Sequence, residues 1–139
     1  MIRLLTGSTH TGKTLLAQRL LERHGAPYLS IDHLKMGLIR SGMCPLTPES
    51  PDEALTAVLW PVVREIVKTA VENGQSLTVE GCYIPFNWRE DFDASYLPHI
   101  RFLCLVFSEA YIRTRFDAIQ THANAIERRK DDSFCTMEL

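Results

Sequence analysis

The first 25 residues pass from a short apolar run to a pattern typical of an amphipathic helix. Ile2, Leu4 and Leu5 form the apolar run. Beyond residue 13, leucine and alanine recur three and four positions apart, which places them on one face of a helix. Gly25, followed closely by Pro27, is a typical helix stop. The pattern therefore predicts a buried strand, a polar loop and a helix, in that order.

A second strand and a second helix follow at once. Residues 27–31 predict a strand that ends on Asp32. Residues 33–40 predict a short helix, closed by a serine-glycine pair. Residues 43–53 are interrupted by prolines and are expected to form a loop.

The most extended helical pattern of this half begins after that loop. Ser50 is expected as its N-cap and Pro51 as its first helical residue. One face of the helix is apolar and carries Leu55, Val58, Leu59, Val62, Ile66, Val67 and Ala70. The helix is expected to end near Asn73 and Gly74, with Pro61 kinking it or lying near its first turns.

Two further strands are predicted in the remainder of the chain. Residues 76–81 (SLTVEG) predict a third strand that ends in an acid and a glycine, followed by a loop and a short helix over residues 82–91. Residues 99–107 (HIRFLCLVF) are the most apolar run and predict a central buried strand. Ser108 is placed to cap a last helix, from residue 109 towards residue 129.

Strands thus alternate with helices along the whole chain, as they do in α/β proteins. Such alternation predicts a parallel sheet with right-handed crossovers and helices on both faces, a three-layer, doubly wound fold. With 139 residues, the chain is expected to form one domain, residues 1–139. Ligands of such sheets bind beyond the carboxyl ends of the strands.

Composition and charge exclude several classes of protein. A formal net charge of −2 at pH 7 argues against nucleic acid as the main partner. No apolar stretch approaches the roughly 20 residues that span a bilayer, so no membrane segment is expected. The N-terminus is already a predicted strand, which argues against a signal peptide. Cys44, Cys82, Cys104 and Cys135 lack metal-ligand spacing, and we interpret them as reduced thiols of a cytoplasmic protein.

The loop between the first strand and the first helix carries the strongest motif in the chain. Residues 7–14 (GSTHTGKT) fit G-x-x-x-x-G-K-[ST] at every fixed position. This pattern wraps backbone N–H groups around a polyphosphate, with the lysine on the β/γ-phosphates and the hydroxyl on Mg²⁺. The motif follows a predicted strand and opens a predicted helix, as it requires. The candidate nucleotide-binding residues are Gly7, Ser8, Thr9, His10, Thr11, Gly12, Lys13 and Thr14.

Polar residues are also expected where the other strands end. Asp32 ends the second predicted strand, Glu80 ends the third, and Ser108 and Glu109 follow the fourth. Each of them could simply cap the next helix. Together, on the edge that carries a phosphate loop, they favour a functional site.

Four segments of the chain carry a resemblance to a known family. They are GSTHTGKT, the acid after the second strand in SIDHLKMGLIRSG, the EG of TVEGCYIPFNWR, and the arginine-bearing YIRTRFDAIQTHANAIERR. With them the chain resembles the P-loop small-molecule kinases, which include adenylate kinase, shikimate kinase and the zeta-toxin-type kinases. The resemblance extends from Met1 to about Lys130. It implies the nucleotide-kinase-like P-loop NTPase fold, with ATP and Mg²⁺ as nucleotide and metal.

The resemblance implies roles for the residues around the phosphates. Lys13 would neutralise charge on the β/γ-phosphates, and Thr14 would hold Mg²⁺. Glu80 would contact the metal through water, and Gly81 would let the substrate approach.

It also implies an acceptor-binding region over residues 33–50. Asp32 would lie near the acceptor hydroxyl and is the candidate general base. Arg40 resembles the arginine that clamps the anionic group of the acceptor. Arg89 could match the arginine that follows the acid-glycine step, although the spacing is longer here.

Residues 109–130 correspond to the lid of the family. Arg113, Arg115 and Arg128 would close over the transferred phosphoryl group, with Arg115 as a catalytic residue. Each has a simpler alternative: Arg113 is four residues before Asp117, an ordinary surface pair, and Arg128 could complement a helix dipole.

The chain departs from the family pattern at its C-terminal end. Members of the family continue beyond the lid with a strand, an adenine-contacting loop and a helix, whereas FCTMEL alone follows the lid-like segment here. We therefore expect the fold to lack a final edge strand and helix. An open edge beside residues 99–107 would expose apolar surface and favour a homodimer.

Two functions remain open at this point. The first is an ATP-dependent kinase that acts on a hydroxyl or phosphate of a small-molecule acceptor. The second is a nucleotide-binding protein without transfer activity. A GTPase is less favoured because no N-K-x-D motif is present, and a motor-type ATPase because no apolar run ends in paired acids.

Overall fold

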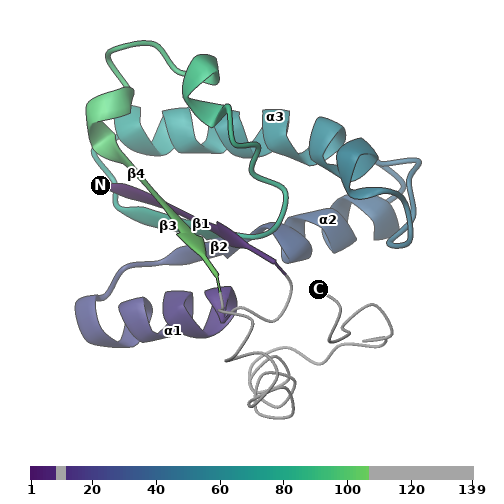
Figure 1. Ribbon diagram of the computed structural model, residues 1–139, viewed down its shortest axis with the longest axis horizontal. Helices are drawn as coiled ribbons and strands as arrows, with labels where there is room; N and C mark the ends of the chain where they lie inside the picture. Colours follow the sequence, from purple (N-terminus) through teal and green to yellow (C-terminus); the bar gives the residue numbers. More distant parts are fainter. Residues whose placement is uncertain (9–11, 107–139) are drawn as a thin grey trace.

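The computed structural model describes residues 1–8 and 12–106 (Figure 1). The described chain runs through four strands, three α-helices and two short 3₁₀ helices. In order they are β1 (Ile2–Gly7), α1 (Lys13–His24), β2 (Tyr28–Ser30), α2 (Ile31–Arg40), α3 (Asp52–Glu72), β3 (Leu77–Glu80), η1 (Trp88–Asp91), η2 (Leu97–His99) and β4 (Ile100–Leu105). Among the described residues, no helix is long and apolar enough to span a bilayer.

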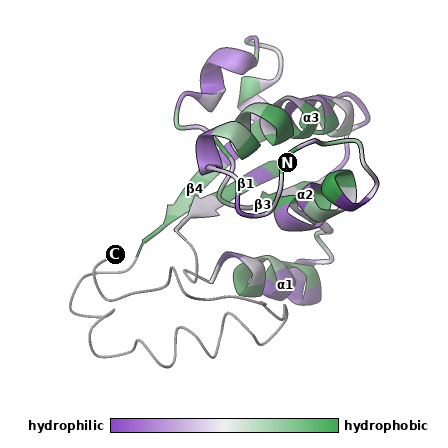
Figure 2. Ribbon diagram, turned by 90° about the vertical axis from the view of Figure 1, so that its right-hand side faces the viewer, coloured by the Kyte–Doolittle hydropathy of each residue, from purple (hydrophilic) through white to green (hydrophobic). Residues whose placement is uncertain are grey.

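The four strands form one sheet in the order β2-β3-β1-β4, and every neighbouring pair is parallel. Helix α1 covers one face of the sheet and α3 covers the other, with α2 beside α3 (Figures 1 and 2). The predicted three-layer α/β architecture is therefore confirmed. In this register Glu80 of β3 lies opposite Leu5 of β1 on one side and Ser30 of β2 on the other.

The main hydrophobic core lies between the sheet and α3. Helix α3 directs a stripe of apolar side chains at the sheet because they recur three or four residues apart. The fully or nearly buried side chains of this stripe are Leu55, Leu59, Val63, Val67 and Ala70. They pack in one cluster with Ile2, Leu4, Val79 and Ile100 of the strands.

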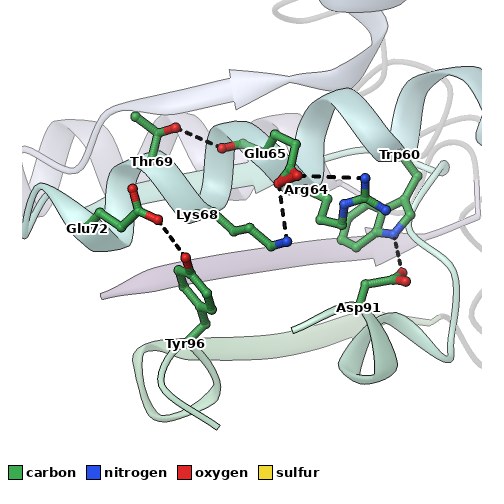
Figure 3. A network of polar contacts seen from close by, with 8 residues as sticks. All are labelled: Trp60, Arg64, Glu65, Lys68, Thr69, Glu72, Asp91 and Tyr96. Carbon is green, nitrogen blue, oxygen red and sulfur yellow. Dashed lines mark hydrogen bonds and ion pairs between the residues drawn. The ribbon is translucent and has the colours of Figure 1, made fainter. Parts of the chain in front are cut away.

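An aromatic cluster extends this core beyond β3. Trp88 stacks on Phe102 of β4 at 5.7 Å between ring centroids, and Phe92 meets the edges of Trp60 and Tyr96. Figure 3 shows how polar contacts along α3 accompany it, including the Trp60 indole, which donates a 2.7 Å hydrogen bond to Asp91. These contacts hold η1 and η2 against α3.

Two helix starts differ from the prediction. Strand β2 ends at Ser30, and Asp32 lies in the first turn of α2 rather than at the end of the strand. The predicted cap of the long helix is also wrong. Pro51 occupies the N-cap position, and the Ser50 hydroxyl accepts a 3.0 Å hydrogen bond from the Thr47 amide within the preceding turn.

Strand β4 differs from the prediction in its place in the sheet. Its apolar sequence predicted a central strand, whereas the family pattern predicted an open edge beside it. Within the described sheet β4 lies at the edge, beside β1 alone, as the second of these expectations has it. Leu103 is 48% exposed and Val106 is 78% exposed. The apolar run therefore does not mark the centre of the sheet, which β1 and β3 occupy. Whether this edge pairs with a second copy of the chain remains a prediction.

The expected lid helix over residues 109–130 lies outside the described residues. Its Ser108 cap and its arginines, Arg113, Arg115 and Arg128, lie outside them as well. Their roles remain predictions.

Candidate functional site

The candidate phosphate loop joins β1 to α1. Gly7 ends β1, and α1 begins at Lys13 directly after Gly12. Gly12 has a φ of 89°, in the left-handed region that residues with a Cβ rarely adopt. The backbone conformation at the start of α1 therefore favours glycine at position 12. Thr9, His10 and Thr11 lie outside the described residues.

Lys13 turns back from the first position of α1 onto the loop. Its ammonium donates a 2.8 Å hydrogen bond to the carbonyl oxygen of Ser8, and the residue is only 7% exposed. A buried ammonium at the N-terminus of a helix adds to the positive end of the helix dipole. The loop therefore concentrates positive charge where the sequence predicted a polyphosphate.

Thr14 and Glu80 form the second part of the site. The Thr14 hydroxyl donates a 2.9 Å hydrogen bond to Oε1 of Glu80, which is 1% exposed at the end of β3. The fold thus brings into contact two residues that the sequence analysis identified as separate candidates. Because the threonine proton points to the carboxylate, its oxygen lone pairs are left for a cation.

This pair fits the donor set that Mg²⁺ uses in nucleotide sites. Mg²⁺ keeps several waters and takes one or two protein oxygens together with phosphate oxygens. Within residues 1–8 and 12–106, no three or more His, Cys, Asp or Glu side chains cluster as a metal cage would require. A hydroxyl next to a single buried carboxylate is consistent with a metal brought in by the nucleotide.

Gly81 has a packing reason for being glycine. A Cβ at this position would lie 2.8 Å from the Cβ of Ile31, the first residue of α2. The amide of Gly81 also donates a 3.0 Å hydrogen bond to the Leu5 carbonyl oxygen. The close contact fixes the start of α2 against the carboxyl end of β3. Its predicted role in substrate approach remains a prediction.

A third group of side chains lies beyond the ends of β2 and β3. The Lys35 ammonium is 3.3 Å from Oδ1 of Asp32 and donates a 3.0 Å hydrogen bond to the Tyr83 hydroxyl. The ammonium also lies 5.2 Å from the centroid of the Tyr83 ring. Our sequence reasoning missed Lys35. Its position three residues after Asp32, on the same face of a helix, was the signal that could have identified it.

Burial and mutual contacts set the protonation of this group. Burial lowers the pKa of Lys35, but the hydrogen bond to Tyr83 and the charge of Asp32 outweigh it and raise the pKa. Burial raises the pKa of Tyr83, which the Lys35 contact offsets only in part. At neutral pH, Lys35 is therefore a cation and Tyr83 a neutral phenol.

The two arginines predicted for the acceptor are both exposed. Arg40 is exposed in the last turn of α2, which at 1.5 Å per residue is about 12 Å along the helix from Asp32. Arg89 is exposed in η1, with its guanidinium 5.3 Å from the centroid of the Trp88 ring. Any contact of either with an acceptor remains a prediction.

Comparison with known proteins places the fold. No model of a protein family matches the sequence, and no curated protein matches it. Among solved structures, a gluconokinase from Sinorhizobium meliloti 1021 is 19% identical with a TM-score of 0.52, covering 94% of this chain and 77% of its own. A sugar kinase from Janibacter sp. HTCC2649 is 18% identical with a TM-score of 0.51, covering 94% and 80%.

A third solved structure has the largest coverage of the three. It is a protein provisionally assigned as a kinase from Chloroflexus aurantiacus j-10-fl, 23% identical with a TM-score of 0.57, covering 99% of this chain and 76% of its own. At these identities the likeness concerns the fold. The chain therefore shares the parallel α/β fold of these three solved structures.

Proposed function

We propose that the protein is an ATP-dependent phosphotransferase, which moves the γ-phosphoryl group of Mg-ATP to a hydroxyl of a small-molecule acceptor. The observation that carries this proposal is the Thr14–Glu80 hydrogen bond beside the buried Lys13. It puts a cation, a hydroxyl and a carboxylate at the N-terminus of α1. The kinase fold of the solved structures supports the same activity.

Each residue of the site would contact a different part of the bound nucleotide and its metal. Phosphoryl transfer needs positioning and positive charge around the phosphate oxygens more than covalent help. Lys13 would exchange its contact with the Ser8 carbonyl for the β/γ-phosphates, and the amides before α1 would surround the same group. Thr14 would contribute its oxygen to Mg²⁺, and Glu80 would accept hydrogen bonds from the water around the metal.

The acceptor would bind on the side of the group formed by Asp32, Lys35 and Tyr83. Asp32 would accept the proton of the attacking hydroxyl, because its carboxylate is the most exposed polar end of this group. We propose a polyhydroxylated acceptor, a sugar or a sugar acid, since two of the solved structures of this fold are a gluconokinase and a sugar kinase.

Calorimetry and product analysis test the proposal together. Titration with Mg-ATP is expected to give saturable heat for the parent protein, and Lys13→Ala is expected to weaken binding about 100-fold or more by removing the buried cation. Arg19→Ala, an exposed arginine on the same helix, is the matched control and should bind like the parent. Incubation with Mg-ATP and a panel of sugars, sugar acids and nucleosides, followed by mass spectrometry, should reveal a phosphorylated acceptor.

The outcomes separate the two functions left open by the sequence. Saturable Mg-ATP binding without any phosphorylated product across the panel would favour a nucleotide-binding protein that does not transfer. Absence of binding heat, with Lys13→Ala indistinguishable from the parent, would overturn the nucleotide site itself.

A further inference from the structure

Lys35 joins the two segments that border the proposed acceptor site. It extends from α2 to Tyr83, which follows β3 by three residues, and it contacts Asp32 on its own helix. We propose that Lys35 is a positioning residue for phosphoryl transfer, which holds the Asp32 carboxylate in place from an anchor on the buried Tyr83 hydroxyl. This inference rests on the proposed function and assigns Lys35 a role at that same site.

Exposure rises in steps along this chain of contacts. Tyr83 is 6% exposed, the Lys35 side chain 14% and the Asp32 side chain 27%. The phenol is therefore fixed in the core, the ammonium is fixed on the phenol, and the carboxylate is the end that solvent and substrate reach. A carboxylate accepts up to about four hydrogen bonds, so the contact of Lys35 with Oδ1 leaves room for an acceptor hydroxyl.

Charge gives a second reason for the pairing. Asp32 comes two residues after the end of β2, and Glu80 ends the neighbouring parallel strand β3. Both therefore lie at the carboxyl edge of the sheet, where the candidate phosphate loop also lies. A carboxylate close to a triphosphate is repelled by it, and the repulsion is stronger in a partly buried site. The ammonium of Lys35 offsets the charge of Asp32, so that the carboxylate can stay near the nucleotide without weakening its binding.

The chain contains a close local match of this arrangement on α3. Lys68 lies 3.3 Å from Glu65, three residues before it, and its ammonium is 5.8 Å from the centroid of the Tyr96 ring (Figure 3). Here the Tyr96 hydroxyl donates to Glu72 rather than accepting from the lysine, and Glu65 is 57% exposed. Lys68 lies near the end of α3, away from the carboxyl edge of the sheet, so Lys68→Met is a matched control for Lys35→Met.

The activity test compares three variants of the full chain on the acceptor identified by product analysis. Lys35→Met is expected to lower kcat/KM about 10-fold to 100-fold, the scale of a misplaced catalytic group. Lys35→Arg retains the charge and the hydrogen-bond donors and should recover part of the lost activity, although the larger guanidinium fits the site less well. Lys68→Met should stay within about 2-fold of the parent. Equal losses in Lys35→Met and Lys35→Arg, or a parental rate in Lys35→Met, would overturn the inference.

A double-mutant cycle separates positioning from general stabilisation. In an Asp32→Asn background the carboxylate that Lys35 positions is gone, so adding Lys35→Met should lower the residual rate by less than about 2-fold. An undiminished loss in that background would mean that Lys35 acts independently of Asp32, and would overturn the inference.

A second cycle needs no activity and tests the anchor. Lys35→Met and Tyr83→Phe are expected to be non-additive in urea unfolding, because each removes the same hydrogen bond. Strict additivity would overturn the anchor and the inference with it. If the parent transfers no phosphoryl group, the proposed function itself fails. If the parent and Lys35→Met transfer the phosphoryl group equally well, only the positioning role of Lys35 fails.

Discussion

The Thr14 hydroxyl donates a 2.9 Å hydrogen bond to Glu80, a residue 66 positions further along the chain. One partner lies in the first turn of α1, and the other ends β3 between β1 and β2. A parallel sheet makes this contact possible because the carboxyl ends of its strands all meet at one edge. The bond ties the first turn of α1, beside the candidate phosphate loop, to the end of β3.

Removal of the Thr14 hydroxyl should impair both the fold and the site. Thr14→Val keeps the shape but leaves the buried Glu80 carboxylate with one donor fewer, at a cost of about 1–3 kcal/mol in the free energy of unfolding. Mg-ATP binding should weaken more than binding of ATP without metal, because the lost oxygen is the proposed metal ligand. Urea unfolding and calorimetry with and without Mg²⁺ measure the two effects.

Thr69→Val is the control for this variant, since the Thr69 hydroxyl donates to a backbone carbonyl on the exposed face of α3. It should leave both measurements near the parent. Thr14→Ser, which keeps the hydroxyl, should bind Mg-ATP nearly as well as the parent. A Thr14→Val protein that still prefers Mg-ATP to free ATP to the parental extent would remove Thr14 from the metal site.

Over the described residues, periodicity and motif spacing predicted the order of the strands and α-helices, the parallel sheet, and the proximity of Thr14 to the end of β3. These features depend on local patterns that repeat over many residues, so errors at single positions do not matter. Asp32 shows the opposite case. Whether a polar residue ends a strand or begins a helix depends on two or three backbone angles, which the composition of that short segment does not specify.

The errors over β4 and Lys35 have a common physical origin. Apolar runs are typical of strands covered on both faces, but an edge strand can be equally apolar with one face covered, as Phe102 of β4 stacks on Trp88 while Leu103 is 48% exposed. Lysine on a helix is usually a solvated residue, so its residue type alone does not identify Lys35. Its contact with Tyr83 joins residues 48 positions apart, which no local pattern reveals.

The glycine at position 81 should not be replaceable by alanine. The added Cβ would lie 2.8 Å from the Ile31 Cβ, closer than carbon atoms approach, so α2 or β3 must shift. Overpacking of this kind costs about 1–3 kcal/mol. Gly37→Ala is the control. Gly37 lies in the interior of α2, the helix that Ile31 begins, and a Cβ there would meet nothing within 4 Å.

The two alanine variants are expected to differ in sign. Gly37→Ala should stabilise the protein by roughly 0.5–1 kcal/mol, since alanine restricts the unfolded chain and favours the helix. Urea unfolding measures both changes. Equal stabilities for Gly81→Ala and Gly37→Ala would show that the start of α2 does not depend on its contact with Gly81.

The pair of Tyr96 and Glu72 gives a prediction about alkaline pH. The hydrogen bond to the Glu72 carboxylate raises the pKa of Tyr96 to about 12, above the ordinary value of 10.0. Because the folded-state pKa is the higher one, the stabilisation from this bond is fully present below pH 10 and is lost as the pH rises towards 12. Its loss should therefore add to alkaline unfolding.

Phenolate absorbance measures the titration, with the contribution of Tyr96 isolated as the difference between the parent and Tyr96→Phe. Glu72→Gln should bring the midpoint back towards the ordinary tyrosine value. Glu22→Gln, an exposed acid on α1, should leave it in place. A Tyr96 midpoint near 10 in the parent would contradict the contact.

The Trp60–Asp91 hydrogen bond should be the main polar contact that holds η1 against α3. The Trp60 residue is 5% exposed, and its indole N–H donates to Oδ2 of Asp91 at 2.7 Å. Asp91→Ala leaves this buried donor without its partner and should destabilise the protein by about 1–3 kcal/mol. Asp91→Asn keeps an acceptor oxygen and should cost less, because the indole can still donate to the amide.

Urea unfolding followed by tryptophan fluorescence measures these changes. Glu90→Ala is the control: it removes the neighbouring exposed carboxylate, which accepts only a 3.3 Å bond from Asn87, and should change stability by less than about 0.5 kcal/mol. The order of stability is thus expected to be parent and Glu90→Ala first, then Asp91→Asn, then Asp91→Ala. If Asp91→Ala were as stable as Glu90→Ala, water would have to reach the indole N–H, and the aromatic cluster around Trp60 would be looser than its edge contact with Phe92 implies.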